Sequence, residues 1–339
     1  MSVLATGAAQ IRASRRVKRR WLAVALVVIT GVGVTYWRLE PWFAPRVIEY
    51  PMLVQTDIPT AVAVAPEGAV WFTIELSDAI GVLRDGKIHR LPKGTPNLEP
   101  LGLAVDASGG AWYTDTPARA IARMAPDGTI RSFPLASPVA RMGRLAVAAD
   151  GTVWFADATT FSITSLKNAV FTRHDLGPSR ASPFAVAVAA DGTVWATLQE
   201  VNKLLRLSRD GQLTEFDVPT RLSGLGDVAV DPSGAVWFIE TRANKIGQFK
   251  QGSGFAEFAI PTQAAAPTAL AVAPDGAIWF TELRAQKLGR LHDGRITEFR
   301  LPQADARPFS IAVDAENNVW YTDLSGRLGM LAFDRGTAR

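Results

Sequence analysis

Acidic side chains recur at nearly the same distance after a series of tryptophans. Five of these acids stand three residues after their tryptophan, and a sixth stands four residues after it. The six acids are Glu75, Asp115, Asp157, Glu240, Glu282 and Asp323. Carboxylates gathered in one place can hold a hard cation such as Mg²⁺ or Ca²⁺, or can bind a polar ligand. The same regular spacing also suits a structural role, in which each acid bonds the backbone of the loop that follows it.

Arginines stand in the segments that lead into the next apolar stretch, as Arg141 and Arg144 do. A planar guanidinium binds a carboxylate through two parallel hydrogen bonds, so arginines above a set of acids suit a ligand that carries carboxylates or hydroxyls. The alternative is a rim of surface salt bridges, which would contribute little stability. Because binding residues concentrate on loops that a rigid scaffold gathers together, we expect both arginines and the acids to line one pocket for a small polar molecule.

The composition excludes several kinds of catalytic site. The chain of 339 residues has no cysteine, which excludes disulfides, a thiolate nucleophile and thiolate metal ligands. It has three histidines, at His89, His174 and His292. It contains no phosphate-binding loop, no HExxH motif and no Ser-His-Asp set that would indicate a hydrolase or a nucleotide enzyme. The chemistry that stays open is that of carboxylates, guanidiniums and any metal that carboxylates hold.

The tryptophans that precede the acids mark a repeat of 41 or 42 residues. Seven of them carry it, at Trp71, Trp112, Trp154, Trp195, Trp237, Trp279 and Trp320. Each repeat reads as four short strands separated by glycine turns, from a small-apolar first strand, as in 267–272, to an alternating last strand, as in 296–301. A period of this length predicts an all-β fold, a seven-bladed β-propeller of four-stranded antiparallel blades.

The two ends of the repeat complement each other. The last repeat stops after its third strand, at 327–333, while an additional strand at 47–53 precedes the first repeat. We expect this strand to supply the missing outer strand of the seventh blade, which closes the ring and leaves no open edge. The propeller is thus predicted to span residues 47–334, followed by a short tail at 335–339.

The strand order places the acids and the histidines differently. In an antiparallel blade the second strand ends beside the start of the first, so the acids after the tryptophans should share one face with the loops that enter the next blade. By the same logic Glu99, which precedes an inner strand, should lie near Asp115. His89 and His174 fall in outer strands and His292 in a hairpin on the opposite face, so none of the three should reach a central pocket.

The blade motifs resemble those of the streptogramin (virginiamycin B) lyase family, and more distantly those of NHL-repeat and gluconolactonase-like propellers. The motifs are P-x-x-[VIL]-A-V, D-G-x-[VI]-W-F-T-E, [IL]-G-R-[IL] and I-T-E-F-x-L-P, and they cover residues 47–334. The resemblance implies that a histidine after the proline that opens an inner strand acts as general base, while nearby acids hold Mg²⁺. Glu99 and Asp115 match these acids, but Leu101 stands at the histidine position, and none of the other six strand openings carries a histidine. The resemblance therefore implies a metal site at Glu99 and Asp115 without the base that proton abstraction needs.

The segment before the propeller reads as a membrane anchor. A basic tail at 1–20, with six Lys and Arg and no acid, precedes an uncharged apolar run at 21–37 and a linker at 38–46. The run is just long enough to span a bilayer, and no cleavage site typical of a signal peptide follows it. Because basic flanks stay in the cytoplasm, we expect an uncleaved single-pass signal-anchor helix in the cytoplasmic membrane, with the N-terminus inside and the propeller on the periplasmic or extracellular side.

The net charge of +4 does not indicate a nucleic-acid partner. Without the six basic residues of the tail, the 36 Lys and Arg fall to 30, against 32 Asp and Glu. A nucleic-acid-binding protein concentrates basic charge on its folded domain. The expected partners are the membrane, a small polar molecule or an envelope protein, and no nucleic acid.

Two functions of different classes follow from these observations. The first is a ligand- or partner-binding module that resembles the lyases but lacks their catalytic histidine. The second is a metal-dependent lyase or lactonase-like hydrolase acting on a cyclic ester, in which a carboxylate or a water bound to Mg²⁺ or Ca²⁺ replaces the imidazole. A purely structural role in an envelope complex is a third interpretation. The sequence identifies neither the substrate nor the partner.

Overall fold

The computed structural model describes residues 46–332, except 95, 97–99, 137–140 and 177–180. The predicted cytoplasmic tail, membrane helix and most of the linker lie outside these residues, as do Glu99 and the tail after the propeller. Within the residues that the structure describes, no helix is long and apolar enough to cross a membrane. The predicted anchor therefore stays a prediction.

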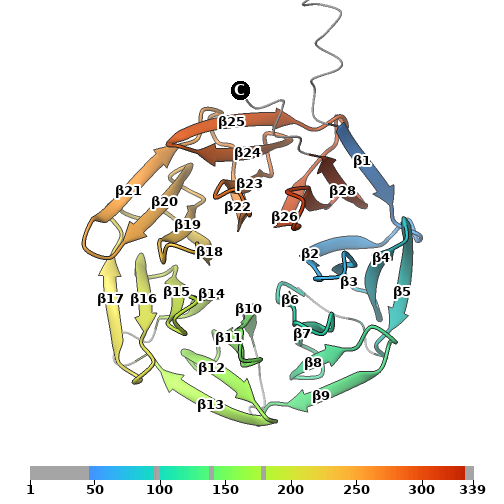
Figure 1. Ribbon diagram of the computed structural model, residues 1–339, viewed down its shortest axis with the longest axis horizontal. Coiled ribbons are helices and arrows are strands. Elements are labelled where there is room, and N and C mark those ends of the chain that lie inside the picture. The colour runs from blue at the N-terminus through green and yellow to red at the C-terminus, as the bar shows by residue number, and fades with distance from the viewer. Residues whose placement is uncertain (1–45, 95, 97–99, 137–140, 177–180, 333–339) are drawn as a thin grey trace, which may run out of the picture. The chain divides into compact units, whose positions relative to one another are not determined.

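The described residues form seven four-stranded antiparallel sheets arranged around a central axis, as predicted (Figure 1). Blade 1 consists of β2 (Ile58–Val64), β3 (Val70–Glu75), β4 (Ala79–Arg84) and β5 (Lys87–Pro92). Blade 2 consists of β6 (Leu103–Val105), β7 (Ala111–Asp115), β8 (Ala120–Met124) and β9 (Ile130–Pro134). Blade 3 consists of β10 (Met142–Val147), β11 (Val153–Asp157), β12 (Ser162–Lys167) and β13 (Val170–Asp175).

The remaining blades repeat this arrangement. Blade 4 consists of β14 (Pro183–Val188), β15 (Val194–Leu198), β16 (Lys203–Leu207) and β17 (Leu213–Asp217). Blade 5 consists of β18 (Leu225–Val230), β19 (Val236–Glu240), β20 (Lys245–Lys250) and β21 (Gly254–Ala259). Blade 6 consists of β22 (Pro267–Val272), β23 (Ile278–Glu282), β24 (Lys287–His292) and β25 (Arg295–Arg300). Blade 7 consists of β26 (Pro308–Val313), β27 (Val319–Asp323), β28 (Arg327–Ala332) and β1 (Arg46–Pro51).

Blade 7 is built from both ends of the described chain. Its strand order is β1-β28-β27-β26, so the first strand of the chain forms the outer edge of the last blade (Figure 1). The N–H of Met52 donates to the carbonyl of Gly326 at 3.1 Å, and the Tyr321 hydroxyl lies 3.4 Å from a Glu49 carboxylate oxygen. The ring is therefore closed by strand pairing between segments more than 270 residues apart.

Seven clusters of buried hydrophobic side chains hold neighbouring blades together. One cluster joins Trp279 of blade 6 to Val319 and Leu331 of blade 7, and another joins Phe72 of blade 1 to Trp320 of blade 7. The other five clusters join the other pairs of adjacent blades in the same way. Each blade is thus buried on both faces, which explains why the inner strands are almost continuously apolar.

Glycine in the third strand makes room for an aromatic ring on the second. A Cβ added at Gly289 would lie 2.0 Å from the Phe280 ring, which shows that the ring lies flat across this glycine. The same pairing occurs in blades 1, 5 and 7, between Gly81 and Phe72, Gly247 and Phe238, and Gly329 and Tyr321. In blade 4 the second strand carries Ala196 instead, and Leu205 stands opposite it. The repeated [IL]-G-R motif is therefore a packing motif.

The loops and hairpins of the blades lie on two different faces of the ring. We call the face where first strands begin and second strands end the loop face, because the connections between blades lie there. We call the opposite face, which carries the turns between first and second and between third and fourth strands, the hairpin face. These two names are used for the sites below.

Loss of β1 should destabilise the whole propeller. A protein that begins at residue 54 leaves β28 with an open edge, and we expect its free energy of unfolding to fall by several kcal/mol, at about 1 kcal/mol for each lost hydrogen bond plus the exposed apolar area. Thermal unfolding compared with that of a protein beginning at residue 45 measures this effect. Equal melting temperatures would contradict closure by β1.

Candidate functional site

A cavity of about 310 Å³ lies on the axis of the propeller, where all seven inner strands meet. Its walls are almost entirely small or aliphatic, from residues such as Ala61, Leu103, Val186 and Leu270. Arg144 and Asp227 are the charged side chains among its lining residues. The cavity therefore combines aliphatic side chains with exposed polar backbone groups and one ion pair, so the surface that it presents is more polar than apolar.

Arg144 and Asp227 reach each other from blades 3 and 5. The Nη1 atom of Arg144 lies 3.3 Å from Oδ2 of Asp227, and both side chains are largely buried. Both residues lie within the register irregularities of their inner strands, between Met142 and Leu145 and between Leu225 and Val228. The same irregularity occurs in β2, β14, β22 and β26, so it is a general feature of the inner strands that places this position beside the axis.

Asp227 is held mainly by the backbone. Its carboxylate accepts the N–H groups of Val228 at 3.0 Å and of Leu270 at 3.2 Å. Burial raises the pKa of Asp227, and the positive charge of Arg144 opposes that rise. Arg144 is less well satisfied, because its buried Nε has no hydrogen-bond partner among the described residues. The guanidinium thus keeps donors for an additional acceptor in the cavity.

The six predicted carboxylates lie at the ends of second strands, as expected, but none of them lines this cavity. Asp157 accepts the N–H groups of Thr159 and Thr160, and Asp323 accepts that of Ser325 at 2.9 Å. Glu75 is half-buried, and the other five acids are at most 5% exposed. For Asp157 and Asp323 the structural interpretation holds, because each bonds the backbone of the loop that follows it.

Of the two predicted pocket arginines, only Arg144 lines the cavity. Arg141 is exposed on the loop face, where its N–H donates to the Thr159 hydroxyl at 2.7 Å. The expectation that Arg141 and the acids share a pocket with Arg144 therefore stays a prediction. Asp227 was not foreseen, although a carboxylate inside a small-apolar run is unusual enough to have indicated it.

Glu240 and Glu282 are buried acids for which neither carboxylate oxygen has a well-formed hydrogen bond to the described residues, although Ser223 lies near Glu240 and Glu298 lies near Glu282. Both side chains are 0% exposed. Burial raises the pKa of each to about 7, and the nearby carboxylates of Glu257 and Glu298 add to the rise. A carboxyl with this pKa is substantially protonated near neutral pH.

Each of these two glutamates lies beside a cluster centred on a lysine, and the two clusters are equivalent. Lys245 Nζ lies 2.6 Å from Glu257 and 2.8 Å from the Thr220 hydroxyl. Blade 6 repeats this with Lys287, Glu298 and Thr262, at 2.7 Å and 2.6 Å. Blade 4 keeps the lysine pair, Lys203 and Glu215 at 2.8 Å, but has Leu198 in place of the buried acid. The pair therefore forms without the buried carboxylate.

The predicted Mg²⁺ or Ca²⁺ site at Glu99 and Asp115 stays a prediction. No group of three or more His, Cys, Asp or Glu side chains converges within the described ranges. Of the predicted metal ligands, Glu99 lies outside these ranges, while Asp115 accepts the Ala118 N–H and lies 3.4 Å from Lys93 Nζ. The side chain of Lys93 is fully buried, and burial lowers its pKa. This buried lysine beside Asp115 has no evident signal in the sequence.

None of the three histidines lines the central cavity. His89 lies in β5 and His174 in β13, both outer strands, as the sequence predicts. His292 is the last residue of β24, where it pairs with Arg295, and so lies one step before the hairpin in which we expected it. The described inner-strand openings carry no imidazole that could reach a ligand on the axis.

These features define the class of the protein, a seven-bladed β-propeller with a small axial cavity that contains a single ion pair. The chain belongs to the virginiamycin B lyase family, whose family model matches residues 43–207 and 167–338. The resemblance indicated by the blade motifs is thereby confirmed. Among curated proteins, none matches this chain.

Solved structures of similar fold include lyases of this family. One is a catalytically inactive histidine-to-alanine variant of virginiamycin B lyase from Staphylococcus aureus with quinupristin, with 27% identity, a TM-score of 0.80, and coverage of 85% of this chain and 99% of that chain. A streptogramin B lyase structure has 26% identity, a TM-score of 0.81, and coverage of 87% and 100%. Hydrazine synthase from Kuenenia stuttgartiensis, at 13% identity and a TM-score of 0.67 over 83% and 97% of the chains, shares the fold alone.

The buried glutamates should make the stability of the propeller fall as pH rises from about 4.5 to 7. The folded-state pKa of about 7 lies above the ordinary glutamate value of 4.5, so the favourable protonated form is present at low pH and is lost as pH passes about 7. Replacing Glu240 and Glu282 by Gln should remove this loss, and the variant should gain up to roughly 3 kcal/mol per residue over the native protein above pH 7.

Urea unfolding at pH 4.5, 6 and 8 measures the difference between the two proteins. Glu67→Gln, which changes an exposed acid, is the matched control and should show no such trend. A stability difference that does not change with pH would contradict the raised pKa of the two glutamates.

Proposed function

We propose that this chain is a ligand-binding propeller of the virginiamycin B lyase family that does not carry out the lyase reaction. The observation that supports this most directly is the content of the axial cavity, which has an arginine–aspartate pair and no histidine among its lining residues. The lyase-type mechanism implied by the family needs a base within hydrogen-bond reach of the proton that it removes. Arg144 cannot serve, because a guanidinium does not lose its proton at neutral pH. The carboxylate of Asp227 is engaged by Arg144 and by the backbone N–H groups of Val228 and Leu270, which lowers its capacity to accept a proton.

The solved relative supports the same interpretation. The Staphylococcus aureus lyase that carries a histidine-to-alanine substitution is catalytically inactive. None of the seven inner-strand openings of this chain carries a histidine, and Leu101, at the opening that leads into β6, lines the axial cavity. The chain therefore lacks a histidine wherever the repeat could place one beside the axis, while it retains the scaffold that positions a ligand.

The charge and shape of the cavity favour a small ligand with a carboxylate. Arg144 can offer further N–H donors beside the one directed at Asp227, whose own charge is bonded by two backbone N–H groups. A bidentate carboxylate on a buried guanidinium forms charge-assisted hydrogen bonds. The aliphatic walls then suit the apolar part of the same molecule. A volume of about 310 Å³ limits this ligand to roughly the lower end of small-molecule sites.

The location proposed for this binding module is the outer side of the cytoplasmic membrane. The support is the sequence alone, namely the basic tail at 1–20 followed by the apolar run at 21–37. In that compartment the ligand is a small polar molecule or an exposed segment of an envelope protein. Reporter fusions at residue 45 test the location, and cytoplasmic reporter activity there would contradict it.

A carboxylate ligand should depend on Arg144. We expect branched monocarboxylates such as 4-methylpentanoate to bind with a dissociation constant that rises at least tenfold in Arg144→Gln, because the charge-assisted bonds are lost. Lys87→Gln removes one exposed positive charge in blade 1 and should leave binding unchanged. Isothermal titration calorimetry measures both. Equal binding by the native protein and Arg144→Gln would contradict the proposal.

The protein should not open the ring of a streptogramin B antibiotic at a rate comparable with the lyases. A positioned general base contributes about 10²- to 10⁴-fold to such a reaction, and Leu101 supplies none. Incubation with quinupristin and Mg²⁺, followed by mass spectrometry, tests this, with Leu101→His as the variant that introduces an imidazole. Efficient turnover by the unmodified protein would instead favour the metal-dependent lyase or lactonase-like enzyme.

A further inference from the structure

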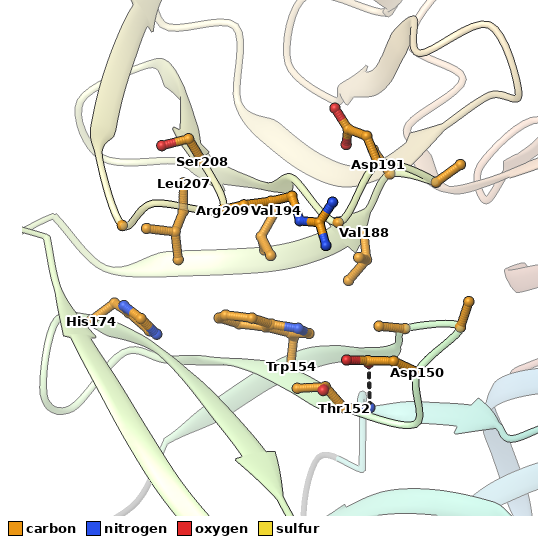
Figure 2. A pocket seen from close by; sticks show the side chains of 16 residues that line it. Asp150, Thr152, Trp154, His174, Val188, Asp191, Val194, Leu207, Ser208 and Arg209 are labelled. Atoms are coloured by element: carbon orange, nitrogen blue, oxygen red, sulfur yellow. Dashed lines mark hydrogen bonds between the residues drawn. The ribbon is translucent and has the colours of Figure 1, made fainter.

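A second pocket lies between blades 3 and 4 on the hairpin face, away from the carboxylates of the loop face. It has a volume of about 310 Å³ and shares only Val188 with the axial cavity. Blade 3 contributes Trp154 and His174, and blade 4 contributes Val194 and Leu207 (Figure 2). We call this pocket the interblade slot. It is independent of the proposed function, because neither Arg144 nor Asp227 lines it.

His174 occupies a position that other blades fill with an aromatic hydrocarbon ring. It pairs with the second residue of the neighbouring third strand, as do four phenylalanines in the other blades. These are Phe133, Phe216, Phe258 and Phe299. Each packs against the tryptophan of its own blade, as His174 does against Trp154 in a tilted arrangement with 5.4 Å between ring centroids. A polar ring therefore replaces an apolar one at the blade that lines the slot.

The imidazole of His174 offers both a donor and an acceptor. Burial lowers its pKa, which favours the neutral ring at pH 7. A neutral imidazole carries one N–H and one bare nitrogen. Phenylalanine would pack on Trp154 equally well without this capacity, so packing alone does not account for the histidine.

The indole N–H of Trp154 has no aspartate beside it. In blades 2, 5 and 7 an aspartate six residues before the tryptophan accepts this N–H at 2.8 to 3.0 Å. Blade 3 has Ala148 at the corresponding position, and blades 1, 4 and 6 likewise have alanine there. Trp154 is only partly buried, whereas Trp71 and Trp279 are fully buried. The slot therefore presents an aromatic face together with an available donor.

Apolar side chains form the wall opposite this face. Val188, Val194 and Leu207 lie across the slot from the Trp154 ring, and Arg209 and Asp150 lie on its two sides at one end (Figure 2). The ion pair with Lys167 is the main cause that lowers the pKa of Asp150 to about 2, so this carboxylate is an acceptor at neutral pH. The slot thus has two apolar walls, with hydrogen-bond donors and acceptors around the edge between them.

We propose that the interblade slot binds one hexopyranose ring of a sugar or glycan. A pyranose with equatorial hydroxyls has two C–H faces and a polar edge, which matches a slot with two apolar walls and a polar rim. Its hydroxyls both donate and accept, which suits an edge that offers imidazole, indole N–H, guanidinium and carboxylate together. The charged groups of the rim are Asp150, Asp191 and Arg209, so two carboxylates disfavour an anion while all three groups can bond the hydroxyls of a neutral polyhydroxy ligand. An aromatic ring would use the walls but few of these polar groups.

The proposal is tested with glucose and N-acetylglucosamine on the full-length protein in a detergent without sugar groups. Saturation-transfer NMR and calorimetry should show saturable binding in the millimolar range. Binding should weaken at least tenfold in Trp154→Ala, and severalfold in His174→Phe, which restores the residue of the other blades and should keep the fold. Arg173→Ala, an exposed change on the same strand β13, is the matched control and should bind normally.

Three outcomes would overturn the proposal. One is the absence of saturable binding of either sugar. Another is binding that His174→Phe and Arg209→Ala leave unchanged, which would place the sugar elsewhere. The third is tighter binding of indole than of either sugar at the same site, which would assign the slot to aromatic rings. Loss of carboxylate binding in Arg144→Gln with sugar binding retained would confirm that the two sites are separate.

Discussion

The closure of the ring by β1 is the constraint on which the rest of the structure depends. Every hydrophobic cluster lies between two blades, so no blade buries its apolar faces without both neighbours. Blade 7 meets this condition only because β1 pairs with β28 and Tyr50 stacks on Trp320. The axial cavity depends on the same condition, since residues from all seven blades line it.

The axis also limits the chemistry available at the centre. Inner strands that converge there need small residues, as shown by Gly143, where an added Cβ would lie 2.1 Å from the carbonyl oxygen of Phe184. Two charged residues, Arg144 and Asp227, occupy this crowded region and neutralise each other across it. A buried ion pair is weak evidence for stability, because desolvation offsets the attraction. Its position at a cavity is the basis of the binding role proposed above. Of the acids at the strand ends, Asp115, Asp157 and Asp323 bond the loops that follow them.

The sequence was sufficient for the fold and only partly sufficient for the sites. The tryptophan period predicts the seven blades, and the incomplete last repeat predicts closure by the first strand, because both follow from chain order alone. The positions of Asp157 and Asp323 at strand ends were also predictable, but their burial was not, since it depends on how each loop folds back. Arg144 and Asp227 meet through bulges in two strands, and the interblade slot depends on side chains from two repeats. Contacts between residues of different blades do not follow the repeat period, so the repeat pattern alone does not predict them.

The construction of blade 7 has a consequence for the order of the blades along the chain. Because Met52 bonds Gly326, β1 and β28 run antiparallel, and the start of β1 lies at the same end of the sheet as the end of β28. A short turn could join these two ends and produce a covalently circular propeller with no first or last blade. Opening such a circle at another hairpin would give a permuted chain with the same ring. The order in which the blades follow one another along the chain is therefore not required by the architecture, because all seven blades have the same strand arrangement.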